Sequence, residues 1–297
     1  MKNVVVSFMT VDKQEIVRSL TCKRDLEMAL IAYASFLKYN QQHTKLLVHT
    51  DGSLDERDIE RLYTTLPGIE VIDRKTTNEQ VSEVLARYPN CLKFRETHPL
   101  SNKILDIPIL ESSCIKFIDC DILFFKPFTG FFSDDCSSRF CLEDDCGYSG
   151  RLVELMKVSS NAIPEGCNTG IFQMVKQRFD LAYIEWFLSQ QNLCMFPGMI
   201  EQTLFALFMG SDDAYSYNKH QISTSKNRLQ VSEQTIAIHF MYDFKKLFFE
   251  YAQKLDERVG KEPVSINLTK AKRLKYAYIV KRALNTRLKN LMPAEQK

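Results

Sequence analysis

The chain has 297 residues, of which 45% are hydrophobic, and a formal net charge of +2 at pH 7. Its length suits one large α/β domain or two small ones, with enough apolar residues for a hydrophobic core. The charge is uneven, because residues 264–297 carry nine lysines and arginines against one acidic residue, a net +8 that leaves −6 elsewhere. An acidic body without a legible nucleic-acid module argues against a nucleic-acid-binding protein.

The nine cysteines and the N-terminus bear on the cellular compartment. The cysteines are odd in number and show no paired metal-ligand spacing, so we interpret them as small thiols, several of them buried, of a reducing compartment. The apolar run over 4–9 is too short for a signal peptide or a membrane span. We therefore expect a cytoplasmic protein.

The expected elements alternate along the first half of the chain. In chain order we expect a strand over 3–9, a helix capped by Asp25, a strand over 45–49, a helix after a capping box Ser53-x-x-Glu56, and strands over 69–72 and 115–118. This β-α-β-α-β order predicts a parallel sheet with helices on both faces, whose ligands bind beyond the carboxyl ends of the strands. Further strands are expected over 139–142, 170–175 and 236–240, and a short helix over 201–209.

Two carboxylates, Asp119 and Asp121, follow the apolar strand over 115–118, and a second apolar run comes directly after them. In an extended chain the two side chains point the same way. Burying such a pair without a partner costs several kcal/mol, so a divalent cation is the economical partner. Two hard oxygen ligands suit Mn²⁺ or Mg²⁺. The alternative is that the triplet is an ordinary strand-to-loop turn.

Four short motifs, taken in order, resemble nucleotide-sugar glycosyltransferases of the GT-A fold. They are most similar to the retaining group that contains lipopolysaccharide galactosyltransferases and glycogenin, over roughly residues 1–250. The motifs are Phe117-Ile-Asp-Cys-Asp-Ile, Cys167-Asn168-Thr-Gly-Ile-Phe, Glu201-Gln202 at a helix start, and His239-Phe240 with Lys245 six residues on.

The chain departs from that group's pattern at several positions. The closing His-x-x-Gly-x-x-Lys-Pro-Trp motif has no glycine here, where Met241 or Tyr242 stands, and Lys246-Leu247 replaces Pro-Trp. Glu201 replaces the aspartate of an Asp-Gln pair, and Cys167 replaces an aromatic residue.

The resemblance implies a metal-dependent glycosyltransferase that moves a sugar, with retention, from a UDP-sugar donor to a glycan or lipid-linked acceptor. It implies a Rossmann-like, mostly parallel sheet flanked by helices over residues 1–262. The implied roles are metal ligands (Asp119, Asp121, His239, with Mn²⁺ or Mg²⁺), pyrophosphate contacts (Lys103, Lys245), uridine contacts (Thr10, Asp12) and contacts to donor sugar and acceptor (Asn168, Glu201, Gln202). Of the three acids Glu143, Asp144 and Asp145, one would bind sugar hydroxyls or, in an inverting enzyme, deprotonate the acceptor.

Residues 263–297 are expected to form a basic amphipathic helical tail. Its stripe of residues at 3-4-3-4-3 spacing is Leu274, Ala277, Lys281, Leu284, Leu288 and Leu291. Such a helix suits an anionic membrane surface, which would make the protein peripheral on the cytoplasmic membrane face. The alternative is a helix packed back on the acidic body.

Two other functions remain open from the sequence. A haloacid-dehalogenase-like phosphatase also carries Asp-x-Asp at a strand end, but near the N-terminus and followed by Thr or Val, whereas Ile122-Leu123 follow here. A non-catalytic sugar-nucleotide-binding or scaffold protein would keep the same fold.

Overall fold

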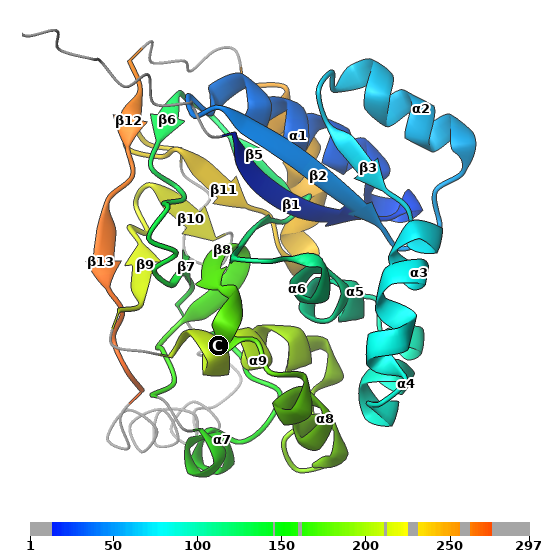
Figure 1. Ribbon diagram of the computed structural model, residues 1–297. Helices are drawn as coiled ribbons and strands as arrows, with labels where there is room; N and C mark the ends of the chain where they lie inside the picture. The colour runs from blue at the N-terminus through cyan, green and yellow to red at the C-terminus, as the bar shows by residue number, and fades with distance from the viewer. Residues whose placement is uncertain are drawn as a thin grey trace, which may run out of the picture.

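The computed structural model describes residues 14–144, 146–159, 162–210, 213–224, 231–255 and 262–274. It is a mixed α/β structure with a central eight-stranded sheet flanked by helices (Figure 1). The expected α/β architecture is therefore confirmed. The expected strand over 3–9 lies outside the described residues.

The large sheet has the strand order β13-β9-β7-β8-β4-β1-β2-β3. Its strands are β1 (Glu15–Thr21), β2 (Thr44–Thr50), β3 (Glu70–Ile72), β4 (Cys114–Ile118), β7 (Arg139–Leu142), β8 (Cys167–Val175), β9 (Tyr215–Tyr217) and β13 (Leu268–Lys270). The half formed by β3, β2, β1 and β4 is parallel, whereas β8 runs antiparallel to both β4 and β7. The chain moves outward from β1 to β3 and then returns to β4 on the other side of β1. Such a reversal creates a crevice at the carboxyl ends of β1 and β4, where open α/β sheets bind ligands.

Two smaller sheets complete the strand structure. A three-stranded sheet contains β10 (Ile222–Thr224), β11 (Ala237–His239) and β5 (Ile122–Phe124), and a two-stranded one contains β12 (Val264–Ser265) and β6 (Phe128–Thr129). Strand β11 runs antiparallel to β5, with His239 opposite Ile122. This pairing brings the residues after β4 next to the last part of the chain.

The α-helices connect the strands and cover the large sheet. They are α1 (Leu26–Tyr39), α2 (Glu56–Thr65), α3 (Arg74–Leu85), α4 (Pro89–Thr97), α5 (Ser101–Ile104), α6 (Asp106–Leu110), α7 (Leu152–Val158), α8 (Leu181–Ser189), α9 (Ile200–Met209) and α10 (Phe248–Ala252). Short 3₁₀ helices are η1 (Lys23–Asp25), η2 (Lys176–Arg178), η3 (Pro197–Met199) and η4 (Tyr242–Leu247).

The hydrophobic residues divide into two clusters, as the alternation of side chains along a strand requires. In β4, Ile115 and Phe117 belong to the cluster that contains buried residues of α5, α8 and α9, whereas Ile118 belongs to the cluster that contains α1. Because both faces of β4 are covered, the strand is fully buried up to the point where Asp119 begins. This burial fixes where the carboxylates emerge.

Two predicted helix starts differ in detail from the structure. The capping box of α2 is formed by Asp55 and Asp58, each side chain accepting the other's backbone N–H at 3.0 Å, and not by Ser53 and Glu56. Ser53 instead accepts the backbone N–H of Lys23. Asp25 stands at the start of α1 as predicted, but its side chain makes no capping hydrogen bond.

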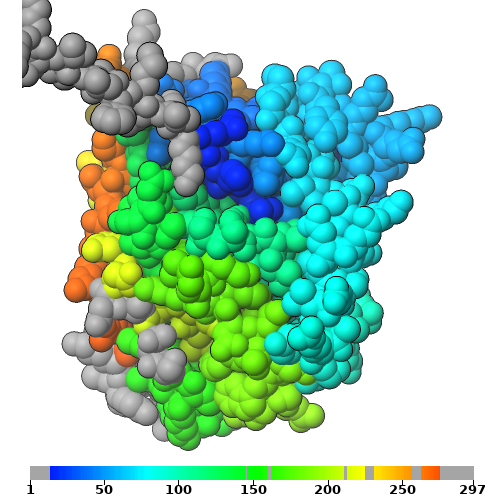
Figure 2. Space-filling model, in the orientation of Figure 1, coloured from blue at the N-terminus to red at the C-terminus, as the bar shows by residue number. Residues whose placement is uncertain are grey.

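The beginning of the expected tail is built into the sheets. Strand β12 pairs with β6 and β13 pairs with β9, so residues 264–270 are extended and not helical. They lie along the left edge of the molecule in Figure 2 (orange). Leu274 is buried against the same cluster as α9. The rest of the predicted helix, residues 275–297, lies outside the described residues. Within the part of the chain that the structure describes, no helix is both long enough and apolar enough to cross a membrane.

Candidate active site

A cavity of about 440 Å³ opens beyond the carboxyl ends of β1 and β4, at the crevice that the strand order predicts. Residues between Leu20 and Lys245 contribute to its walls. The polar and charged lining residues are Thr21, Cys22, Arg24, Asp25, Asp51, Lys103, Asp119, Asp121, Asn168, Thr169, Glu201, Gln202, His239, Tyr242 and Lys245.

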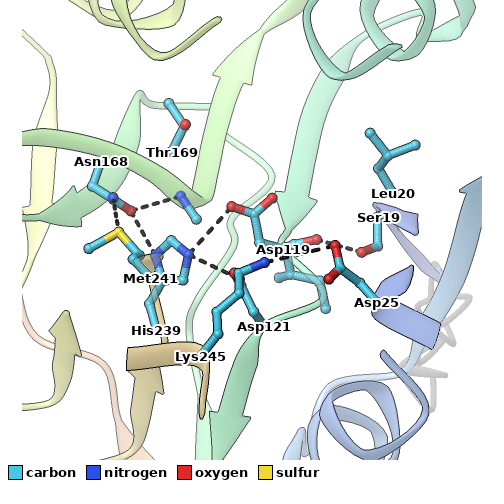
Figure 3. A network of polar contacts seen from close by, with 12 residues as sticks. Ser19, Leu20, Asp25, Asp119, Asp121, Asn168, Thr169, His239, Met241 and Lys245 are labelled. Atoms are coloured by element: carbon cyan, nitrogen blue, oxygen red, sulfur yellow. Dashed lines mark hydrogen bonds and ion pairs between the residues drawn. The ribbon is translucent and has the colours of Figure 1, made fainter. Parts of the chain in front are cut away.

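The three predicted metal ligands line this cavity and lie next to one another (Figure 3). Atom Nε2 of His239 lies 3.0 Å from Oδ1 of Asp121 and 3.6 Å from Oδ2 of Asp119. One ligand atom from each residue lies within 4.8 Å of the others, close enough to hold one ion. The structure thus brings these three side chains together from two segments that are far apart in the sequence.

Backbone hydrogen bonds fix both carboxylates. The N–H of Asp119 donates to the carbonyl of Gly170 at 2.7 Å, and the carbonyl of Asp121 accepts the N–H of Phe240 at 2.9 Å. Gly170 has a second role, since a Cβ atom there would lie 2.3 Å from Nδ1 of His239. Only glycine lets the imidazole approach strand β8 so closely.

The surroundings of His239 and Asp121 fit a metal. The Oδ1 atom of Asn168 lies 3.1 Å from Nδ1 of His239, and it also accepts the backbone N–H of Gly170. Because an amide oxygen only accepts, it favours a proton on Nδ1 and leaves Nε2 as a lone-pair donor facing the carboxylates. Oδ1 of Asp121 is buried and accepts no well-formed hydrogen bond. A cation at this point would satisfy both atoms.

The pKa values of Asp119 and Asp121 reflect their burial, their mutual repulsion and the positive charges nearby. Burial raises the pKa of Asp119 above its usual range, more than Lys103 lowers it, and the charge of Asp121 adds to the rise. Burial also acts to raise the pKa of Asp121, but His239 and Lys245 outweigh it and hold that pKa below its usual range. Burial alone would lower the pKa of His239, yet Asp121 and Asp119 raise it. Two close carboxylates thus depend on nearby positive charge to stay ionised.

The two predicted pyrophosphate lysines occupy different environments. Lys103 is 2% exposed and holds Asp119 at 2.9 and 3.1 Å and Glu201 at 3.3 Å. The side chain of Lys245 is 36% exposed and contacts Asp121 at 3.1 Å and Asp25 at 3.8 Å. Lys103 therefore lies beneath the carboxylates, whereas Lys245 faces the cavity.

The residues predicted to face the donor sugar come from β8 and the first turn of α9. Asn168 donates to Oε2 of Glu143 at 2.9 Å and lies 3.5 Å from the side-chain oxygen of Gln202. Gln202, at the first turn of α9, donates to the carbonyl of Gly147 at 3.0 Å. Glu201 is turned toward Lys103 and is bonded to Thr169 at 3.3 Å.

The three predicted acids, Glu143, Asp144 and Asp145, do not form one group. Glu143 is buried and bound to Asn168, so it belongs to the same network. Both Glu143 and Asp144 line a second cavity, where Asp144 pairs with Lys219 at 3.3 Å. Asp145 lies outside the described residues, as do the predicted uridine contacts Thr10 and Asp12.

Sequence reasoning missed the cavity wall formed by Cys22, Arg24, Asp25 and Asp51. These residues follow β1 and β2, and β1 itself was not predicted. The available signal was loop length, since a strand over 3–9 leaves a long gap before the helix at 26, whereas β1 reaches it in four residues. Short connections of two to six residues are the rule in α/β units.

No protein-family model and no curated protein sequence matches the chain. Solved structures do. The galactosyltransferase LgtC in complex with donor and acceptor sugar analogues aligns with a TM-score of 0.50 at 13% identity, over 81% of this chain and 96% of that one. An active-site glutamine-to-glutamate mutant of LgtC gives a TM-score of 0.51 at 14% identity, with the same coverage. The bifunctional glycosyltransferase WbbM in its apo form gives 0.50 at 10% identity, over 84% of this chain and 52% of that one. The chain has the GT-A glycosyltransferase fold.

Proposed function

We propose that the protein is a metal-dependent glycosyltransferase that transfers a sugar from a UDP-sugar to a glycan or lipid-linked acceptor with retention of configuration. The observation that supports this most strongly is the Asp119, Asp121 and His239 group at the crevice of a GT-A fold. Lys245 lies beside that group and faces the cavity, as an anionic donor would require.

Asp119, Asp121 and His239 would hold Mn²⁺ or Mg²⁺, and the nitrogen ligand favours Mn²⁺. When bound, the ion would stabilise the negative charge that develops on the diphosphate as the sugar leaves. The protein contributes the fixed position of the ligands. Asn168 orients His239, and Lys103 holds Asp119 from below.

The diphosphate and the uridine would lie on the β1 side of the carboxylates. Lys245 supplies a positive charge that exchanges Asp121 and Asp25 for phosphate oxygens. Asp51 and the turn after β1 offer hydrogen-bonding groups for the ribose and base. Contacts from Thr10 and Asp12 stay a prediction from the resemblance.

The donor sugar would lie between the carboxylates and α9, against Asn168 and Gln202. Glu201 is held by Lys103 and Thr169, so we assign it a positioning role. Gln202 is a neutral group near the place where the anomeric bond breaks, and no free carboxylate is needed there for a retaining reaction. The structurally similar LgtC also has a glutamine in its active site.

The basic residues after 274 bear on the acceptor and on the cellular site. A lipid-linked acceptor would fit a protein that docks on the cytoplasmic face of an anionic membrane through the basic residues after 274. Each basic residue near such a surface is worth about 1 kcal/mol, so reversible binding is expected.

Titration calorimetry with UDP, with and without Mn²⁺, tests the function directly. We expect tight UDP binding only with the metal, followed by donor hydrolysis for one member of a panel of sugar nucleotides. A phosphatase would show no preference for uridine, and a non-catalytic binding protein would bind UDP without hydrolysing any donor. UDP binding that ignores Mn²⁺ would contradict the metal site.

A further inference from the structure

Tyr242 adopts a backbone conformation that residues with side chains rarely adopt. Its φ is +51°, in the left-handed region, and it begins the 3₁₀ helix η4 that also carries Lys245. It stands where the similar closing motif has glycine, the residue that tolerates this conformation. The chain therefore keeps a glycine-type backbone turn while placing a large aromatic side chain on it. Strain of this kind, observed at a cavity, points to a functional side chain.

The Tyr242 side chain lies on the cavity wall. It lines the cavity and is 53% exposed. Its hydroxyl lies 3.8 Å from the sulfur of Met199, which lines the same cavity from the 3₁₀ helix before α9. The Met199 sulfur in turn lies 3.9 Å from Nε2 of Gln202. Tyr242 and Met199 thus form an apolar wall next to the residues assigned to the donor sugar.

The side of the cavity that faces β1 is charged, in contrast to the apolar wall of Tyr242 and Met199. The ion pairs of Lys245 with Asp121 and Asp25 lie toward β1, on the side proposed for the diphosphate and uridine. The sulfur of Met241 lies 3.1 Å from Nδ2 of Asn168, so a second methionine adjoins the apolar wall. A ligand that covers Tyr242 and Met199 would need an apolar face and polar edges.

We propose that Tyr242 and Met199 form a platform for the acceptor, and that its ligand is a hexopyranose ring lying with its C–H face on the tyrosine. This inference rests on the proposed function and names the acceptor class of that site. A pyranose has an apolar C–H face and a rim of hydroxyls, which the nearby Gln202 and Asn168 amides can bond. An acceptor hydroxyl on such a ring would point toward the donor sugar. Tyr242 would then determine acceptor specificity without touching the metal.

Saturation-transfer NMR on the full-length protein tests this with three probes, the methyl glycosides of galactose, glucose and mannose, in the presence of UDP and Mn²⁺. In the wild type, one glycoside should receive saturation mainly at the C–H protons of one ring face. Tyr242→Asn keeps a residue that tolerates positive φ but removes the ring, and should weaken glycoside binding by about tenfold. Tyr242→Phe should retain the signal. Phe249→Ala removes an exposed aromatic residue of α10 and is the matched control.

Calorimetry with UDP and Mn²⁺ on the same variants separates this inference from the proposed function. If UDP fails to bind the wild type, the proposed function fails, whereas the platform is tested by the glycosides alone. The platform is overturned if no glycoside binds the wild type, or if Tyr242→Asn leaves the ring-face signal unchanged. It is also overturned if Tyr242→Asn weakens UDP and not the glycoside, since the ring would then stack on the nucleotide. Thermal unfolding checks that the variants fold. Neither Tyr242→Asn nor Tyr242→Gly should lower the unfolding midpoint.

Discussion

One side of the cavity is formed by charged residues and the other by apolar residues. On the side of Asp119, Asp121 and His239, charged groups are buried and hold one another within a few ångströms. On the side of Met199 and Tyr242, the wall is apolar and partly exposed. Buried charges must be paired, so a substitution on the first side disturbs several neighbours at once. The apolar side can change with little effect on the rest. In the proposed glycosyltransferase, this arrangement would let the acceptor vary while the chemistry stays the same.

The largest effect is expected from Asp121→Asn. Loss of one charged ligand should reduce metal-dependent transfer by roughly a thousandfold, because it removes several kcal/mol of charge stabilisation in the transition state. Calorimetry should show that Mn²⁺ no longer strengthens UDP binding. Glu250→Gln, which removes an exposed carboxylate paired with Lys254, is the charge-matched control and should behave as wild type. Transfer within tenfold of wild type in Asp121→Asn would contradict the metal assignment.

Substituting Lys103 and Lys245 distinguishes a residue that stabilises the fold from one that binds the nucleotide. Lys103→Met should lower the free energy of unfolding by about 3–5 kcal/mol, because it leaves the partly buried Asp119 and the buried Glu201 without their shared cation. Lys245→Met should change the stability little, since its side chain is partly exposed, but should weaken UDP binding by about tenfold. Denaturant unfolding and calorimetry on both variants measure the two effects. The same outcome for both lysines would show that they share one role.

Gly170→Ala tests whether the position of the imidazole matters. The added methyl group would displace His239, and disturbing a ligand's support typically lowers metal affinity by about 10- to 100-fold. The Mn²⁺ concentration needed for half-maximal UDP binding should rise by that factor. Gly198→Ala adds the same methyl group where no atom lies within 4 Å, and it should leave the metal requirement unchanged.

A smaller effect on rate is expected from Gln202→Ala, which removes one neutral amide near the donor sugar. Transfer should fall by about tenfold, the worth of a single hydrogen bond. The anomeric proton coupling of the product should show retention in both wild type and variant. An inverted product would move the catalytic role to Glu143, Asp144 or Asp145.

Truncation after Leu274 should affect neither side of the cavity. Residues 264–270 pair with β6 and β9, so they must be kept. Donor hydrolysis in solution should stay nearly unchanged, whereas co-sedimentation with anionic vesicles at low salt should be lost. If the truncated protein unfolds, or if the full-length protein ignores the vesicles, the basic segment serves the fold and not the membrane.

The sequence predicted β2, β3, β4 and the two carboxylates that follow β4, because these depend on local signals. An apolar run that ends in Asp119 and Asp121 marks a buried strand wherever the strand lies in the sheet. The pairing of β11 with β5 is not local, yet the order of short motifs still led to His239. Strand β1 was missed because its pattern is interrupted by Arg18 and Ser19, which are buried through partners elsewhere in the fold. Arg18 bonds His49 and Glu111, and Ser19 donates to the carbonyl of Ile118. No local pattern reveals such partners.

The roles of individual residues were harder to predict than their presence in the site. Lys103 and Lys245 are equivalent in a sequence, but Lys103 is a buried residue of α5 paired with Asp119 and Glu201, whereas Lys245 lies on the 3₁₀ helix η4, which has no buried residue. Asp144 adjoins Glu143 in the chain and lines the same second cavity, yet Glu143 accepts a hydrogen bond from Asn168 whereas Asp144 pairs with Lys219. Tyr242 was noted only as a missing glycine. Its meaning depends on a backbone angle and on Met199, which no sequence pattern reports.

The hydrogen bonds that join Asp119 to Gly170 and Asp121 to Phe240 also bear on how the protein is made. The carboxylates are synthesised well before their imidazole partner, and the strand that carries His239 must find β5 across more than a hundred residues. Closing loops of that length delays folding, and a nascent chain folds from its N-terminus. A ribosome-bound fragment that ends before β11 would carry both carboxylates without the third ligand. The ability to capture Mn²⁺ would therefore appear late in synthesis, and the ion would stabilise finished chains over incomplete ones.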